Sequence, residues 1–283
     1  MSRRCAVALR LVSCLAFLVI SIKPVLANPV VPDFDPADFV AGAPIDNPYF
    51  PLRPGTVFTY GAQVNDEGDT AFELEKDFVT FQTKLIAGVH ATIVHAKTWH
   101  DGVLIEDTFD YHAQDKFGNV WYLGENTKAF DYDENGNLID VDTSGSFLAG
   151  VNGAKGGFIM PANPQVGFEY YQEFSAADEA LDSAKIVSLN EHLTLPIGSF
   201  SNVLKTVEST VLEPGLTENK FYAKGIGQIL TLEDIDATGN PLNTIPLQSV
   251  ATVPLPPAAM TGLTTLAAVL LATVIFTHRR HSN

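Results

Sequence analysis

The chain has 283 residues, and its 33 acidic residues outnumber its 17 lysines and arginines, for a net charge of −16. This excess of negative charge opposes binding to nucleic acid and to anionic lipid, and it attracts cations. Both cysteines, Cys5 and Cys14, precede residue 28, so a mature chain without that segment has no disulfide, no thiol nucleophile and no thiolate metal site.

Residues 1–27 are predicted to be a signal peptide. Three arginines accompany an uncharged, mostly apolar run over 11–22, and the small residue Ala27 suits cleavage by signal peptidase. Asn28 is therefore the expected first residue of the mature chain. We expect export by the general secretory route, and the pair Arg3-Arg4 leaves twin-arginine export open.

A lead rich in Pro and Asp spans 28–54, and we expect it to wrap the edge of the domain that follows at 55–250. The segment 28–257 holds all 33 acidic residues but only 11 lysines and arginines, so its net charge is −22. Its 230 residues are enough to bury a core without disulfides. The simplest interpretation of the charge is a solvated surface that keeps an exported protein soluble.

Short runs with strand-like alternation recur in this domain, with turn-forming residues between them. They cover 56–60, 71–86, 89–99, 103–112, 119–124, 127–132, 137–143, 167–174, 185–195, 203–212, 217–223 and 227–233. Only 176–184 resembles a helix, of about two turns. The sequence predicts an all-β, mainly antiparallel domain that forms a barrel-like or strongly curved single sheet, with a β-sandwich as the alternative. A signal helix and a transmembrane helix are expected to flank it.

Three segments share the pattern D-x-x-G-N, namely 115–119, 133–137 and 236–240. An Asp at the first position caps a type I turn, and a Gly at the fourth position accepts a positive φ. The pattern predicts three tight turns, of which the first two lead directly into strands.

The second of these turns also resembles part of a calcium-binding loop. Oxygen-bearing side chains fall at positions one, three and five, Gly136 is at six and a carboxylate is at twelve. The candidate ligands are Asp131, Asp133, Asn135, Asn137 and Asp142. The loop departs from an EF-hand because its twelfth residue is Asp and its flanks are strand-like, so a plain hairpin turn is the alternative.

A candidate transition-metal site follows from the turn signal Asp101-Gly102. A two-residue turn there pairs residues whose numbers sum to 203, so residues 95, 97, 106, 108, 110 and 112 share one face. His95, Glu106, Asp110 and His112 then form a mixed nitrogen and oxygen cluster. The alternative is a solvent-facing polar surface with a cross-strand ion pair between Lys97 and Glu106.

Sequence motifs for catalysis are absent: the chain has no G-x-S-x-G, no H-E-x-x-H and no phosphate-binding loop. We therefore assign no catalytic residue, and calcium is the one cofactor considered.

The C-terminal segment has three parts: a proline linker over 251–257, an uncharged apolar run over 258–277 and a basic tail over 278–283. A 20-residue helix spans about 30 Å, the thickness of the bilayer core. The basic tail should stay in the cytoplasm, which places the acidic domain outside the membrane.

This arrangement resembles the PEP-CTERM sorting signal of Gram-negative bacteria, here with Val253-Pro254-Leu255-Pro256 and without the glutamate of the name. The resemblance implies recognition by an exosortase, cleavage near the proline motif and transfer to the cell surface or extracellular matrix. The alternative is a permanent single-span anchor in the inner membrane.

Several short sequence segments of the domain resemble those of an uncharacterised family of secreted bacterial β proteins. They are Asn47-Pro48-Tyr49-Phe50-Pro51-Leu52, Gly118-Asn119-Val120-Trp121-Tyr122 and Tyr222-Ala223-Lys224-Gly225-Ile226-Gly227. The resemblance spans roughly 45–234 and implies fold and extracellular location without an activity.

Two classes of function follow from the sequence. The first is a non-catalytic cell-surface or matrix protein whose acidic β domain binds a small ligand, a glycan or a cation. Its expected partners are signal peptidase, exosortase, the membrane and an extracellular polysaccharide, but not nucleic acid. The alternative is a secreted hydrolase or metal-dependent enzyme that uses His95, Glu106, Asp110 and His112.

Overall fold

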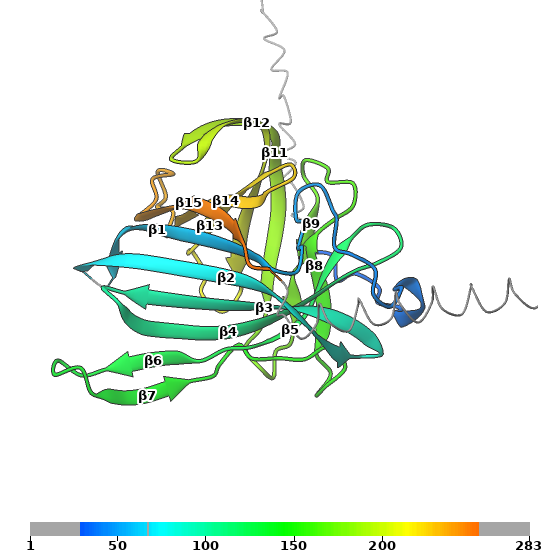
Figure 1. Cartoon of the computed structure of the whole chain (residues 1–283), viewed down its shortest axis with the longest axis horizontal. Coiled ribbons are helices and arrows are strands. Elements are labelled where there is room, and N and C mark those ends of the chain that lie inside the picture. The colour runs from blue at the N-terminus through cyan, green and yellow to red at the C-terminus, as the bar shows by residue number, and fades with distance from the viewer. Residues whose placement is uncertain (1–28, 67, 255–283) are drawn as a thin grey trace, which may run out of the picture.

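A computed structural model describes residues 29–66 and 68–254 (Figure 1). These residues form one 15-stranded antiparallel sheet that curls into a nearly closed barrel, which confirms the all-β prediction in its barrel form. The described residues contain no helix of bilayer-spanning length and hydrophobicity. The predicted signal peptide over 1–27 and the predicted transmembrane helix over 258–277 lie outside them.

The strands follow one another closely along the chain. They are β1 (Thr56–Asp66), β2 (Asp69–Ile86), β3 (Val89–His100), β4 (Val103–Gln114), β5 (Val120–Asn126), β6 (Ala129–Tyr132), β7 (Leu138–Asp142), β8 (Lys155–Met160), β9 (Glu169–Tyr171), β10 (Glu173–Phe174), β11 (Asp182–Leu195), β12 (Gly198–Thr210), β13 (Glu218–Ala223), β14 (Gly227–Glu233) and β15 (Asn243–Thr252). Their order across the sheet is β10-β8-β5-β4-β3-β2-β1-β15-β14-β13-β12-β11-β9. Most neighbours are consecutive in the chain, while β15 returns to pair with β1, and the β6–β7 hairpin extends from β4.

The barrel closes where the chain passes from β9 to β10. β9 pairs with β11, β10 pairs with β8, and Gln172 lies between them. Val30 of the lead adds a parallel bridge to Tyr170 in the same region. Gly157 of β8 permits the close approach, because a Cβ there would overlap the carbonyl oxygen of Tyr171.

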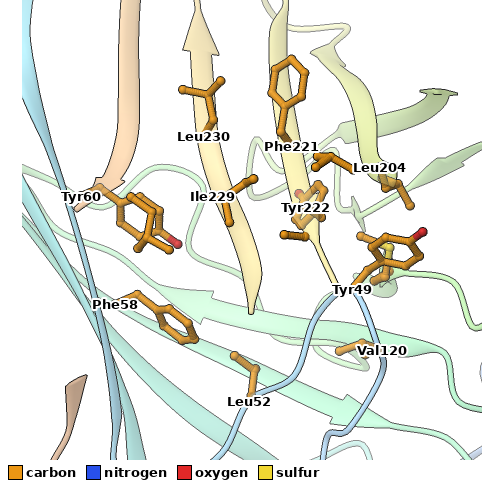
Figure 2. Packing of buried hydrophobic residues seen from close by; sticks show 14 of the residues in the cluster. Tyr49, Leu52, Phe58, Tyr60, Val120, Leu204, Phe221, Tyr222, Ile229 and Leu230 are labelled. Atoms are coloured by element: carbon orange, nitrogen blue, oxygen red, sulfur yellow. The ribbon is translucent and has the colours of Figure 1, made fainter. Parts of the chain in front are cut away.

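Side chains alternate between the two faces of the sheet, and the larger apolar cluster gathers buried residues of the lead and of most strands. Phe58 and Tyr60 of β1 lie across from Ile229 of β14 and Tyr222 of β13, with Leu52 of the lead below them in the view of Figure 2. Full burial of an apolar side chain of this size contributes about 1.5–3 kcal/mol.

The lead covers part of the outward face. Trp121 of β5 points outward, and the rings of Phe34 and Phe39 lie 5.4 and 5.9 Å from its ring. Between these two phenylalanines, Pro36–Asp38 forms a 3-10 turn capped by the side chain of Asp35. The lead thus stabilises the wall of the barrel as well as its edge.

The structure confirms the three D-x-x-G-N turns. In each, the carboxylate of the first Asp accepts hydrogen bonds from the backbone N–H groups two and four residues later. Gly118, Gly136 and Gly239 have φ of 96°, 78° and 88°. The repeat therefore forms the same kind of tight turn at three places in the chain.

The predicted helix at 176–184 is wrong. Residues 176–179 form a turn closed by a bridge between Ser175 and Ala180, and β11 begins at Asp182. Asp182 and Ala184 pair with Thr210 and Glu208 of β12. Pairing with a distant strand outweighed the weak local helix preference of so short a segment.

Candidate functional site

A cavity of about 420 Å³ lies inside the barrel. Inward-facing side chains of most strands line it, together with Phe50, Pro51 and Leu52 of the lead and the loops that follow β12 and β14. Nine of the lining residues are acidic, against one lysine: Asp77, Asp110, Glu125, Glu173, Asp182, Glu208, Glu213, Glu218 and Asp234. The cavity therefore concentrates the negative charge of the domain.

Aromatic rings form another part of the wall. Phe50, Phe58, Tyr60, Tyr122 and Tyr222 all line the cavity. The ring of Phe50 lies 6.3 Å from the ring of Tyr222. The cavity thus offers π-faces and apolar surface beside its carboxyl groups.

Lys220 of β13 is the lysine of the cavity wall, and it is paired. Its Nζ lies 2.9 Å from Oε2 of Glu208 and 3.4 Å from Oε2 of Glu218. Burial opposes its charged form, but the charges of Glu208 and Glu218 outweigh burial and hold the pKa of Lys220 well above its usual value. One lysine leaves most of the lining carboxyl groups without a cationic partner.

Tyr122 of β5 joins two of the acids. Its hydroxyl donates to Oδ1 of Asp110 at 2.6 Å and lies 3.1 Å from Oε2 of Glu125. Burial, together with neighbouring acids, raises the pKa of Asp110 to about 6 and that of Glu125 to about 8. Asp110 stays partly open to solvent because it faces the cavity. Near neutral pH Glu125 is therefore mainly protonated, while Asp110 is mainly ionised.

Three buried polar atoms of the described residues have no hydrogen-bond partner, and all three belong to the cavity wall. They are Oδ1 of Asp77, Oε2 of Glu173 and Nδ1 of His112. Glu173 is 7% exposed and His112 is 5% exposed. Buried polar groups are nearly always paired with protein or water, so the wall of this cavity is where the described residues depart from that rule.

The protein environment shifts the pKa values of these three groups. Burial, with the charges of nearby acids, raises the pKa of Glu173 to about 9 and that of Asp77 to about 7. Burial lowers the pKa of His112 to about 3, against the opposing effect of a backbone hydrogen bond at Trp121. At pH 7 the imidazole is neutral, and the cavity contains both protonated and ionised carboxyl groups.

The predicted face with His95, Glu106, Asp110 and His112 is not formed. A type I′ turn at Asp101-Gly102 is present, with φ of 48° and 87°, but a bulge at Thr98 and Trp99 shifts the register by one residue. His95 therefore pairs with Phe109 instead of Thr108. A shift of one residue moves a side chain to the opposite face of a strand.

The shift separates His95 from the other three residues. Nε2 of His95 lies 2.6 Å from Oδ1 of Asp107, and its ring stacks on Phe109 at 4.1 Å. Asp110 and His112 line the cavity. The predicted pair of Lys97 with Glu106 is also replaced, because Nζ of Lys97 lies 3.3 Å from Oδ2 of Asp107.

The candidate calcium ligands lie on the β6–β7 hairpin, which projects from the barrel in Figure 1. The carboxylate of Asp133 accepts the N–H groups of Asn135 and Asn137 at 2.9 and 2.8 Å. Asp142 accepts the N–H of Ser144 at 2.9 Å, and Asp131 pairs with Asp140 across the hairpin. Within 29–66 and 68–254, no three His, Asp or Glu side chains are grouped to hold a metal ion. Calcium binding by this loop stays a prediction.

Sequence reasoning missed the acidic interior. It identified Asp110 and His112 but not Asp77, Glu173 or Lys220. Acidic residues at alternate strand positions are ordinary on a solvated face, so their spacing carries no signal of its own.

Comparison with known proteins gives few matches. No family model matches the sequence, and no curated protein matches it. Solved structures that align with the chain include a protein described as exported, with a YmcC-like fold, from Bacteroides fragilis NCTC 9343. It has a TM-score of 0.39 and 13% identity, over 72% of this chain and 99% of that chain. A protein described as a lipoprotein from Parabacteroides distasonis ATCC 8503 has a TM-score of 0.37 and 12% identity, over 73% and 100%.

Proposed function

We propose that this chain is an exported, non-catalytic binding protein whose barrel cavity holds a small organic cation with an apolar body. The observation that carries the proposal is the composition of the cavity wall, where nine acidic residues face one lysine. The unpartnered oxygen of Glu173, whose side chain is 7% exposed, supports it.

Electrostatics favours a positively charged ligand. Burial, with the charges of nearby acids, raises the pKa of Asp77, Glu125 and Glu173, so these carboxyl groups hold protons in part near neutral pH. A cation that enters replaces those protons and gains an interaction that water screens poorly. The aromatic rings of Phe50, Tyr60 and Tyr222 add apolar contact and cation–π attraction.

The size of the cavity fits a small molecule. Ligand sites commonly enclose about 300–1,000 Å³, and this cavity has about 420 Å³. A metal ion alone would leave most of that volume and all of the aromatic surface unused. An amine that carries an aromatic or aliphatic group uses both parts of the wall.

Calorimetric titration of residues 28–257 at pH 8 and low salt tests the proposal with phenethylamine and 3-phenylpropionate, which match in shape and differ in charge. We expect the amine to bind and the carboxylate not to bind. Glu173→Gln should weaken amine binding about tenfold, or about 1.4 kcal/mol. Glu134→Gln makes the same charge change on the exposed hairpin and should leave binding unchanged. Equal binding of the two compounds, or binding of neither, contradicts the proposal.

Export and surface sorting belong to the same proposal and rest on the two terminal apolar segments at 11–22 and 258–277. Fractionation of the native host, with an antibody against the acidic domain, tests them. We expect a processed form, shortened at the proline motif, outside the inner membrane. A full-length tail that stays in the inner membrane supports the permanent anchor instead.

A second candidate is hydrolysis of an uncharged glycan, which is favoured by one observation. Asp110 and Glu125 are bridged by Tyr122 and have unequal, raised pKa values, and such pairs serve as general acid and base. A panel of nitrophenyl glycosides tests this candidate. Turnover that is abolished in Asp110→Asn supports it, and no turnover with any of them excludes it for those substrates.

A further inference from the structure

We propose that His112 forms a second subsite in the cavity, so that the bound cation is an amine carrying a hydroxyl group away from its ammonium group. This inference rests on the proposed function and specifies the class of ligand. The acids would hold the ammonium group, and the imidazole would hold the hydroxyl.

The position of His112 carries the inference. The side chain lines the cavity, is 5% exposed, and has no hydrogen-bond partner at Nδ1. Its ring stacks on Tyr122 at 5.0 Å and meets the ring of Phe50 edge-on at 5.4 Å. Two aromatic neighbours fix the orientation of the imidazole, so the unpaired nitrogen belongs to a rigid ring.

The chemistry of a neutral imidazole selects the group that binds there. Because His112 is neutral at pH 7, Nδ1 is either a donor or an acceptor according to the tautomer. A hydroxyl both donates and accepts, so it satisfies Nδ1 in either tautomer. An ammonium group only donates, and it gains more from the carboxyl groups elsewhere in the cavity.

The spacing of the two subsites sets the length of the ligand. Asp110 and His112 are two residues apart on β4 and both line the cavity. Two residues of a strand span about 7 Å. Tyramine and 6-amino-1-hexanol separate their nitrogen and oxygen atoms by a comparable length, so both suit the two subsites.

Matched pairs of amines test the inference in the domain 28–257 by calorimetry at pH 8. The pairs are tyramine with phenethylamine and 6-amino-1-hexanol with hexylamine, and each pair differs by one hydroxyl. We expect the hydroxylated member to bind about tenfold more tightly. His112→Phe should remove this preference, so that the two members of each pair bind equally. His112→Gln, which retains hydrogen-bonding groups, should keep part of the preference.

The outcomes separate this inference from the proposed function. If no amine binds, the proposed function fails. If both members of each pair bind equally to the wild-type protein, a water already serves Nδ1 and the hydroxyl subsite is wrong, while the cation site stands. If His112→Phe keeps the tenfold preference with an unchanged circular dichroism spectrum, another group recognises the hydroxyl and the assignment to His112 is overturned.

Discussion

Nε1 of Trp121 donates a hydrogen bond to Oδ2 of Asp115 across 2.9 Å. Asp115 is the first residue of a D-x-x-G-N turn, and it also accepts the N–H groups of Phe117 and Asn119 at 2.9 Å each. The same carboxylate therefore closes the turn between β4 and β5 and fixes the indole that packs against the lead. The other two copies of the turn, at Asp133 and Asp236, are exposed.

Asp115→Ala should destabilise the barrel more than Asp236→Ala, although the two carboxylates hold the same turn. We expect a loss of about 2–4 kcal/mol for Asp115→Ala, because a buried indole N–H is left unpaired, against about 0.5–1 kcal/mol for Asp236→Ala. Urea unfolding of both variants measures the difference. Equal losses would show that the bond to Trp121 contributes nothing beyond the turn.

Gly157→Ala should prevent proper closure of the barrel. The new Cβ would overlap the carbonyl oxygen of Tyr171, and the backbone on both sides has no room to move without breaking the junction of β9 and β10. We expect a loss of more than about 2 kcal/mol. Gly136→Ala is the control, because it meets no atom within 4 Å and has only the strain of a φ of 78°, about 1 kcal/mol. Thermal unfolding compares the two variants. Equal melting temperatures would contradict a tight contact between Gly157 and Tyr171 where the barrel closes.

The unfolding free energy of the ligand-free protein should fall as the pH rises from 6 to 9. The pKa of Asp77 is raised to about 7, that of Glu125 to about 8 and that of Glu173 to about 9. A carboxyl group whose pKa is raised by folding stabilises the folded state fully at pH values below its pKa in the unfolded chain. This stability is lost as the pH rises through the pKa in the folded state. His112, with its lowered pKa, acts oppositely and only below about pH 6.5.

Glu173→Gln isolates one of these contributions. The variant should reduce the loss of stability between pH 6 and pH 9 by on the order of 1–3 kcal/mol, because the amide does not ionise. Denaturant unfolding at both pH values, with Glu134→Gln as the exposed control, gives the comparison. A pH dependence that is unchanged in Glu173→Gln would remove this residue from the buried acidic group.

Lys220→Met should destabilise the protein because it leaves Glu208, which is 6% exposed, without its cation. Lys220 retains some access to solvent through the cavity, so we expect a loss of about 2–3 kcal/mol, below the range for fully buried pairs. The double variant Lys220→Met, Glu208→Gln should recover at least half of the loss. Lys128→Met, at an exposed position, is the control. No recovery in the double variant would mean that Lys220 acts through packing.

Calcium should raise the melting temperature of the domain if the loop from Asp131 to Asp142 binds it, because a ligand of the folded state stabilises that state. EDTA should reverse the rise, and Asp131→Ala with Asp133→Ala should abolish it. A rise that is the same in the double variant would place the cation elsewhere, and the acidic cavity would then be the first place to look.

Local patterns of the sequence predicted the elements well where one residue type determines the backbone. The three turns follow from an Asp that accepts N–H groups and a Gly that accepts a positive φ, and both properties belong to the residues themselves. The pair Asp101-Gly102 likewise set the turn between β3 and β4. These features do not depend on which strands are neighbours.

The same local reasoning assigned the wrong face to β3. One bulge at Thr98 and Trp99 changed the partner of His95 from Thr108 to Phe109. A bulge depends on how two strands twist against the rest of the sheet, and the residues of the turn do not reveal it. A register shift of one residue moves every side chain of a strand to the opposite face. For this reason His95 does not share a face with Asp110 and His112, and the predicted metal site does not form.

Alternation and turn chemistry act over a few residues, so they were enough to predict an all-β antiparallel domain with its tight turns. That Asp77, Glu173 and Lys220 line one cavity follows instead from how the folded strands are arranged. Residues nearly 150 positions apart meet there because the sheet curls until its two ends join at Gln172. Closure of a barrel depends on the pairing of all its strands at once, and that information does not reside in any one segment.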